Sequence, residues 1–138
     1  MIVLDTNVIS ELFKPIPHQP VLAWIERQLD DALFTTAITR GELLVGVHSL
    51  PEGRRKDGLL HGLTRILDNR FVGRVLAYDD EAASTYAAIA AARRAAGRPI
   101  DLADAMIAGI VRAHGATLAT RNVRDFGGCG ITLIDPWH

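Results

Sequence analysis

Short apolar segments alternate with longer amphipathic ones along the chain, and this alternation restricts the possible folds more than any other feature. Helical periodicity fills the longer segments, and several of the short ones are rich in β-branched residues. Strands that alternate with helices predict an α/β domain of three layers, with a central parallel sheet of about five strands flanked by helices. The expected strands are 2–4, 33–37, 75–77, 117–120 and 131–134.

Capping and turn residues delimit the expected helices. Asn7 is expected to cap the first helix, and Pro15 and Pro17 to end it. The segment PEGRRKDG, residues 51–58, is expected to be a polar turn. The alanine-rich segment after Asp79 or Asp80 favours helix and lets another helix approach closely. The expected helices are 7–13, 20–29, 38–50, 59–67, 81–97 and 102–114.

The 138 residues suit one domain, 1–138, which can bury roughly two thirds of its unfolded surface. The only cysteine, Cys129, excludes an internal disulfide. The first ten residues lack the basic start of a signal peptide, and no apolar run approaches the ~20 residues of a membrane span. These features predict a cytoplasmic protein without a membrane partner. The net charge of −1 argues against binding nucleic acid through bulk positive charge.

Several acidic and polar residues are expected to meet at one edge of the sheet. Asp5 directly follows the first strand, and Thr120 and Asn122 end a later one. Ligands bind beyond the carboxyl ends of parallel strands, so these residues lie at the rim where binding is expected. Glu42 and Asp104 lie on helices among apolar neighbours, in TRGELLVG and DLADAMIAGIV.

Carboxylates that converge without cations repel one another. Two like charges ~4 Å apart cost about 4 kcal/mol at an effective dielectric constant near 20. A hard divalent ion reverses the sign of this energy, since Mg²⁺ prefers oxygen ligands and binds one or two carboxylates, water and substrate phosphate. The acids therefore point to Mg²⁺ or Mn²⁺ as the cofactor.

Four segments together carry a family resemblance: VLDTNVISELF at the start, TRGEL, PIDLADAMIAG and LATRNVRDF. In this order and spacing they resemble the PIN-domain ribonucleases, and among them the VapC-type toxins of the FitB-like group. The resemblance extends to the closing DPWH. It implies a metal-dependent endoribonuclease that cleaves RNA, forms a homodimer, and is held inactive by an antitoxin encoded beside it. Operator DNA would be contacted only through the antitoxin.

The resemblance also implies which residues form the active site. Asp5, Glu42 and Asp104 match the acidic triad of the family. The fourth acidic position of many relatives falls on Asn122, which offers a carbonyl oxygen but no charge. Asp125 lies three residues further on and can substitute, so one metal and two metals both remain open.

The expected roles follow from the chemistry of metal-assisted hydrolysis. Asp5 and Asp104 are expected to bind the metal directly, and Glu42 to hold metal or water and to act as a general base. The hydroxyls of Thr6 and Thr120 are expected to orient these groups.

Structural roles are the alternative for each acid. Asp5 can cap a helix, Glu42 can interact with a helix dipole, and Asp104 can support a helix start. Asn122 and Asp125 can satisfy turn backbone. If the acids have only these structural roles, the chain is a catalytically weak PIN-fold module that binds nucleic acid or has a regulatory role.

Other surface features receive simpler interpretations. The basic run 54–56 is expected to be a solvated turn, and Arg93 and Arg94 to interact with a helix dipole. Ile9, Leu12 and Phe13 offer an apolar surface for an antitoxin tail. The alanine-rich helix is the expected dimer interface.

Overall fold

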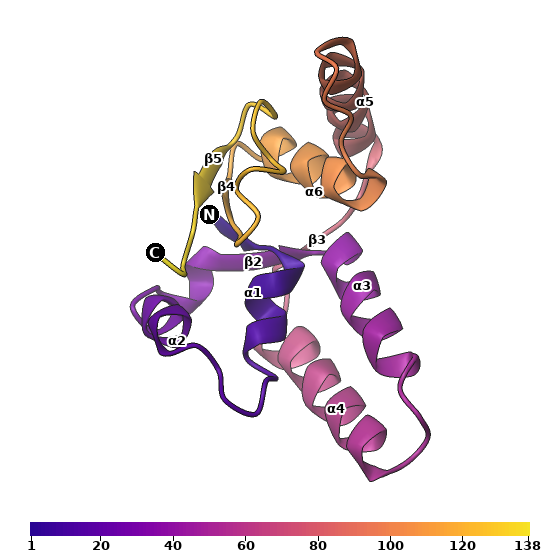
Figure 1. Ribbon diagram of the computed structural model, residues 1–138. Coiled ribbons are helices and arrows are strands. Elements are labelled where there is room, and N and C mark those ends of the chain that lie inside the picture. Colours follow the sequence, from indigo (N-terminus) through magenta and orange to yellow (C-terminus); the bar gives the residue numbers. More distant parts are fainter.

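Five parallel strands form the central sheet of the computed structural model, which describes residues 1–138 (Figure 1). The strands are β1 (Ile2–Leu4), β2 (Leu33–Thr36), β3 (Val75–Leu76), β4 (Thr117–Ala119) and β5 (Thr132–Ile134), in the spatial order β3-β2-β1-β4-β5. The helices are α1 (Thr6–Glu11), α2 (Gln19–Glu26), α3 (Ala37–His48), α4 (Arg54–Arg65), α5 (Asp80–Ala95) and α6 (Leu102–Ala113). Short helical turns add η1 (Asp30–Ala32) and η2 (Ile66–Arg70). None of the helices is long and apolar enough to cross a bilayer.

The two faces of the sheet bury separate apolar cores, because successive residues of a strand point to opposite sides. Val3 of β1 packs with Ile89 of α5 and Ile107 of α6. Its neighbour Leu4 packs on the other face, in the cluster that includes Val8 of α1. Helices therefore cover both faces, and the predicted three-layer α/β fold with a five-stranded parallel sheet is confirmed.

The first helix begins and ends earlier than predicted. Asp5, which has an extended backbone, is the N-cap, and its Oδ1 accepts a hydrogen bond from the Thr6 N–H at 2.8 Å. The prediction that Asn7 is the cap was wrong, because the helix starts directly where β1 ends. At the other end, the buried Glu11 carboxylate accepts hydrogen bonds from Lys14 Nζ and the His18 N–H, and these bonds hold the following turn.

Two other helix boundaries differ from the prediction. Helix α4 already begins at Arg54, so residues 54–58 are helical and only Pro51–Gly53 form the turn. The backbone of Gly53, with φ of 148°, makes the break, and the arginines that follow are good helix formers. Helix α2 ends at Glu26, which leaves Leu29 outside the helix and 75% exposed.

Helices α5 and α6 pack closely, as the alanine-rich sequence predicted. They approach closely at Gly109 of α6, where a Cβ atom would lie 2.8 Å from the Ala82 carbonyl oxygen and 3.0 Å from Tyr86 Cα. The absence of a side chain at Gly109 therefore sets the separation of the two helices. This packing fixes the position of α6, the helix that carries Asp104.

The order of the strands reverses between β1 and β4. From β1 the sheet continues to β2 and β3 on one side, whereas β4 and β5 lie on the other. Such a switch point leaves a crevice beyond the carboxyl ends of the two strands, and ligands of open α/β sheets bind there. Asp5 follows β1 and Thr120 follows β4, so both lie at this crevice.

Candidate active site

Asp5 is the buried acid at the centre of the rim, with only 4% of its surface exposed. Its Oδ1 accepts from the Thr6 N–H, and its Oδ2 accepts from the Thr120 hydroxyl at 2.8 Å and from Asn7 Nδ2 at 3.4 Å. All of these donors are neutral. Burial raises the pKa of the Asp5 carboxyl above its ordinary value, and the charge of Glu42 adds to this effect, while the hydrogen bonds oppose it.

Asn7 connects the two strand ends, a role that the sequence did not reveal. Its Nδ2 also lies 3.4 Å from the Thr120 hydroxyl oxygen, and its Oδ1 accepts from the Arg121 N–H at 3.2 Å. One side chain thus holds the segment after β4 against Asp5. The only sequence signal is the position of Asn7 two residues after Asp5, which is equally compatible with capping.

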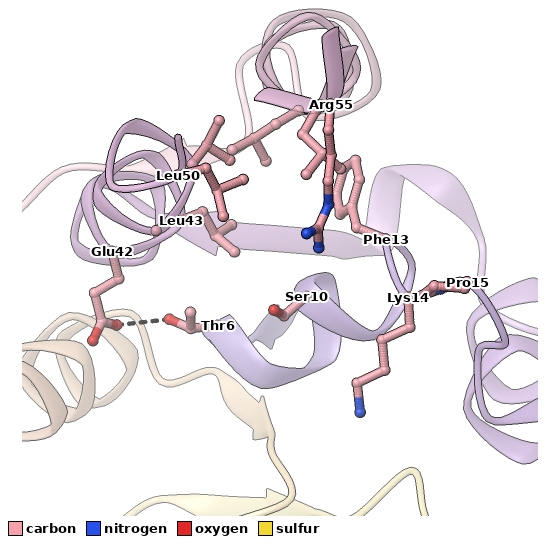
Figure 2. A pocket seen from close by; sticks show the side chains of 13 residues that line it. Thr6, Ser10, Phe13, Lys14, Pro15, Glu42, Leu43, Leu50 and Arg55 are labelled. Atoms are coloured by element: carbon pink, nitrogen blue, oxygen red, sulfur yellow. Dashed lines mark hydrogen bonds between the residues drawn. The ribbon is translucent and has the colours of Figure 1, made fainter. Parts of the chain in front are cut away.

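Glu42 reaches the rim from α3. The Thr6 hydroxyl donates to Glu42 Oε1 at 2.7 Å (Figure 2). The Thr6 hydroxyl oxygen also lies 3.1 Å from the hydroxyl oxygen of the fully buried Thr39. Glu42 itself is exposed, unlike the apolar surroundings that its neighbours in sequence suggested. Thr6 therefore links the end of β1 to Glu42.

Asp104 and Asp125 line the same hollow, with a volume of about 480 Å³. Burial raises the pKa of Asp104 from 3.8 to about 6, and the charges of Asp5, Asp101, Asp125 and Glu42 contribute in that order. The structure thus brings Asp125 into the electrostatic neighbourhood of the other acids.

Asn122 is placed differently. Its N–H donates to the Thr120 hydroxyl oxygen at 3.0 Å, and its exposed side chain makes no hydrogen bond. This main-chain contact fits the structural alternative for Asn122, in which it belongs to a turn.

The donor set suits a hard divalent cation. Its members are carboxylate and hydroxyl oxygens, and none of the rim acids forms an ion pair with a basic side chain. No group of three or more His, Cys, Asp or Glu side chains lies close enough together to hold a metal ion by itself. Mg²⁺ keeps several water ligands and uses one or two carboxylates, so it does not require three such side chains at one point.

An apolar groove of about 350 Å³ leads away from Glu42 and Thr6 between α1, α3 and α4 (Figure 2). Arg55 of α4 also lines it, and its guanidinium points into the groove (Figure 2). Arg55 therefore lies on a helix and not in a turn, but it is exposed to solvent as predicted. The apolar part of the lining is Phe13, Pro15, Leu43, Val47, Leu50, Leu59 and Leu63.

The apolar surface expected at the start of the chain is smaller than predicted. Ile9 is fully buried in the core, because it points toward the sheet from α1. Leu12 and Phe13 both remain partly exposed, and Phe13 lines the groove.

The raised pKa of Asp104 predicts an unusual pH dependence of stability without metal. Because the folded protein binds this proton more tightly than the unfolded chain, the stabilisation is complete below pH 3.8 and is lost as the pH rises through about 6. We expect the unfolding free energy of the chelated wild type, relative to Asp104→Asn, to increase between pH 7 and pH 5. Urea unfolding of both proteins in EDTA checks this, and a difference independent of pH would contradict it.

The fold and the acidic rim together define a PIN-like α/β domain, and comparison with known proteins agrees. The PIN domain family model matches residues 2–126. VapC ribonuclease Y4jK of Sinorhizobium fredii is 42% identical over 138 residues, which are 100% of this chain and 99% of that protein. Toxin FitB of Neisseria gonorrhoeae is 37% identical over 138 residues, with the same coverage of 100% and 99%. The chain belongs to the PIN-domain family.

A solved structure gives the same result. The structure of FitAB bound to an IR36 DNA fragment contains a chain with a TM-score of 0.95 and 36% identity, and the match covers 100% of this chain and 96% of that one. The resemblance to VapC-type proteins of the FitB-like group is therefore confirmed over the whole chain.

Proposed function

We propose that the protein is a metal-dependent endoribonuclease and the toxin of a toxin-antitoxin pair. The observation that carries the proposal is the group of acids at the switch point, Asp5, Glu42 and Asp104, which no basic side chain neutralises. The names of the relatives, VapC ribonuclease and Toxin FitB, support the same activity and role.

In the proposed reaction Asp5 and Asp104 hold Mg²⁺ or Mn²⁺. When bound, such a cation supplies charge neutralisation at a phosphate oxygen and lowers the pKa of water. The hydrogen bonds from Thr120 and Asn7 fix Asp5 Oδ2, so the carboxylate is oriented before metal arrives. Because the carboxylate is already oriented, assembling the metal site costs less free energy.

Glu42 is the proposed general base. The Thr6 hydroxyl holds its Oε1, which leaves Oε2 free to accept a proton from the attacking water. Because the rim is open and Glu42 is exposed, we expect single-stranded or looped RNA, whose backbone can bend toward the acids.

The test is cleavage of a labelled single-stranded RNA by the purified protein. We expect internal cuts in Mg²⁺ or Mn²⁺, none in EDTA, and recovery when excess metal is returned. Equal cleavage in EDTA would contradict the proposal, as would a lack of cleavage of any cellular RNA with either metal.

Asp125 is our choice for the fourth acid, because it shares a hollow with Asp104. We expect Asp125→Asn to lower cleavage by roughly 10- to 100-fold, the usual effect of a supporting residue at a metal site. Asn122→Ala should retain activity close to the wild type, since its side chain makes no hydrogen bond. Initial cleavage rates of the two variants show which residue fills the fourth acidic position. If Asn122→Ala were the slower of the two, that position would belong to Asn122.

The proposed partner is an antitoxin encoded by a neighbouring reading frame. The solved relative is a FitAB complex on DNA, which supports a partner that carries the operator contact. The groove beside Glu42, with its apolar floor, is the surface that we propose for the antitoxin tail. A cationic side chain of the tail would then reach the acidic rim and compete with the metal.

Co-expression tests this role. Expression of the chain alone should arrest growth of its host, expression of Asp104→Asn should not, and a tagged copy of Asp104→Asn should retrieve the product of the neighbouring frame. If the wild type is tolerated at high level and retrieves no small partner, the toxin role fails even where nuclease activity is found.

A further inference from the structure

Arg93 is a buried cation without an acidic partner. Its side chain lies in the last turn of α5, its residue exposure is 7%, and it forms no ion pair. An isolated buried charge costs free energy unless its donors are satisfied. The expected interaction of Arg93 with the helix dipole does not by itself explain why the side chain is buried.

The guanidinium instead binds main-chain carbonyl oxygens of two different segments. Its Nε donates to the Arg98 carbonyl at 2.7 Å, and its Nη1 lies 2.9 Å from both the Asp125 and Gly127 carbonyls. It also lies 3.6 Å from Cys129 Sγ. One side chain thus joins the turn after α5 to the segment that follows β4.

Each of these segments leads to an acid. The turn at Arg98 continues into α6, which carries Asp104, and the other segment contains Asp125 itself. Arg93, Asp104 and Asp125 line the same hollow. The segment from 121 to 131 has no helix or strand, so contacts such as those from Arg93 determine where its acid lies.

We propose that Arg93 is a positioning residue that holds Asp125 beside Asp104, so that the Asp125 carboxylate supports the divalent cation that Asp104 binds. This inference rests on the proposed function. Arg93 donates to three carbonyls and to Cys129 Sγ and to no carboxylate, so both carboxylates remain available to the cation. A lysine has a single nitrogen and cannot reproduce the planar fork that joins both segments.

The test compares Arg93→Met with Arg94→Met, which removes the neighbouring, exposed arginine of the same helix. We expect Arg93→Met to weaken Mn²⁺ binding about 10-fold by calorimetry and to lower kcat with little change in KM for RNA. Arg94→Met should match the wild type in both. Arg93→Lys, which keeps the charge and the buried stem, should fall between them.

A double variant separates positioning from a general structural effect. If Arg93 acts through Asp125, adding Arg93→Met to Asp125→Asn should cause no further loss of Mn²⁺ affinity. The inference would be overturned if the losses of Mn²⁺ affinity were fully additive, or if folded Arg93→Met kept wild-type affinity. It would also be overturned if neither Arg93 variant folded. If the wild type itself binds no Mn²⁺, the proposed function fails first, and the inference with it.

Discussion

Asp104→Asn is expected to lower RNA cleavage by roughly 10²- to 10³-fold or more, the effect of losing one main electrostatic group. The same change should stabilise the metal-free protein, because it removes a carboxyl whose pKa burial and neighbouring acids raise to about 6. Asp104 is only half-buried, so solvent screening reduces the gain to about 1 kcal/mol, or roughly 2–4 °C in melting temperature.

Paired assays of cleavage and thermal unfolding check both parts of this expectation. Asp5→Asn should also lose cleavage, but we expect no matching gain in stability, because an amide nitrogen would replace an oxygen that accepts hydrogen bonds from buried donors. Asp80→Asn, an acid at the start of α5 outside the rim, serves as the control and should keep wild-type cleavage. Full activity in purified Asp104→Asn would remove this residue from the active site.

Gly109→Val is expected to produce the largest loss of stability, about 3 kcal/mol or more. A Cβ at this position would lie 2.8 Å from the Ala82 carbonyl oxygen, and the two extra methyl groups of valine worsen the overlap. Overpacking of this kind usually costs 1–3 kcal/mol, roughly, and here the obstructing atoms belong to a helix backbone that cannot move alone. Helices α5 and α6 would have to separate.

Gly58→Ala is the matched control, because Gly58 lies within α4 and a Cβ there meets no atom within 4 Å. This change should stabilise the protein by about 0.5–1 kcal/mol through helix propensity. Urea unfolding of the two variants should therefore give effects of opposite sign. Stability of Gly109→Val near that of the wild type would show that α5 and α6 are not packed as described.

The sheet could be predicted from the sequence because its signals are local. The strands are short runs of apolar or β-branched residues, and Asp5 and Thr120 directly follow two of them. Parallel strands place such residues on one rim without any knowledge of side-chain contacts. Local signals could not place the two acids on helices, since the positions of Glu42 and Asp104 depend on how α3 and α6 pack. Family resemblance supplied that information.

The remaining features depend on contacts between distant segments. Asn7 resembles a helix cap in sequence, and only its contacts with Thr120 and the Arg121 N–H reveal its bridging role. Arg93 and Arg55 are surface arginines by any local criterion, yet one is buried under two loops and the other points into a groove. The choice between Asn122 and Asp125 likewise depends on loop geometry that no periodic pattern encodes.

The most direct test of the acidic rim is a calorimetric titration of the wild type and Asp5→Asn with Mn²⁺. Asp5 lies at the switch point and its carboxylate is fixed by three neutral donors, so it should contribute to any metal site at this rim. We predict saturable Mn²⁺ binding to the wild type and a loss of at least about 10-fold in affinity in folded Asp5→Asn. Equal affinities in the two proteins would contradict a metal site at the rim.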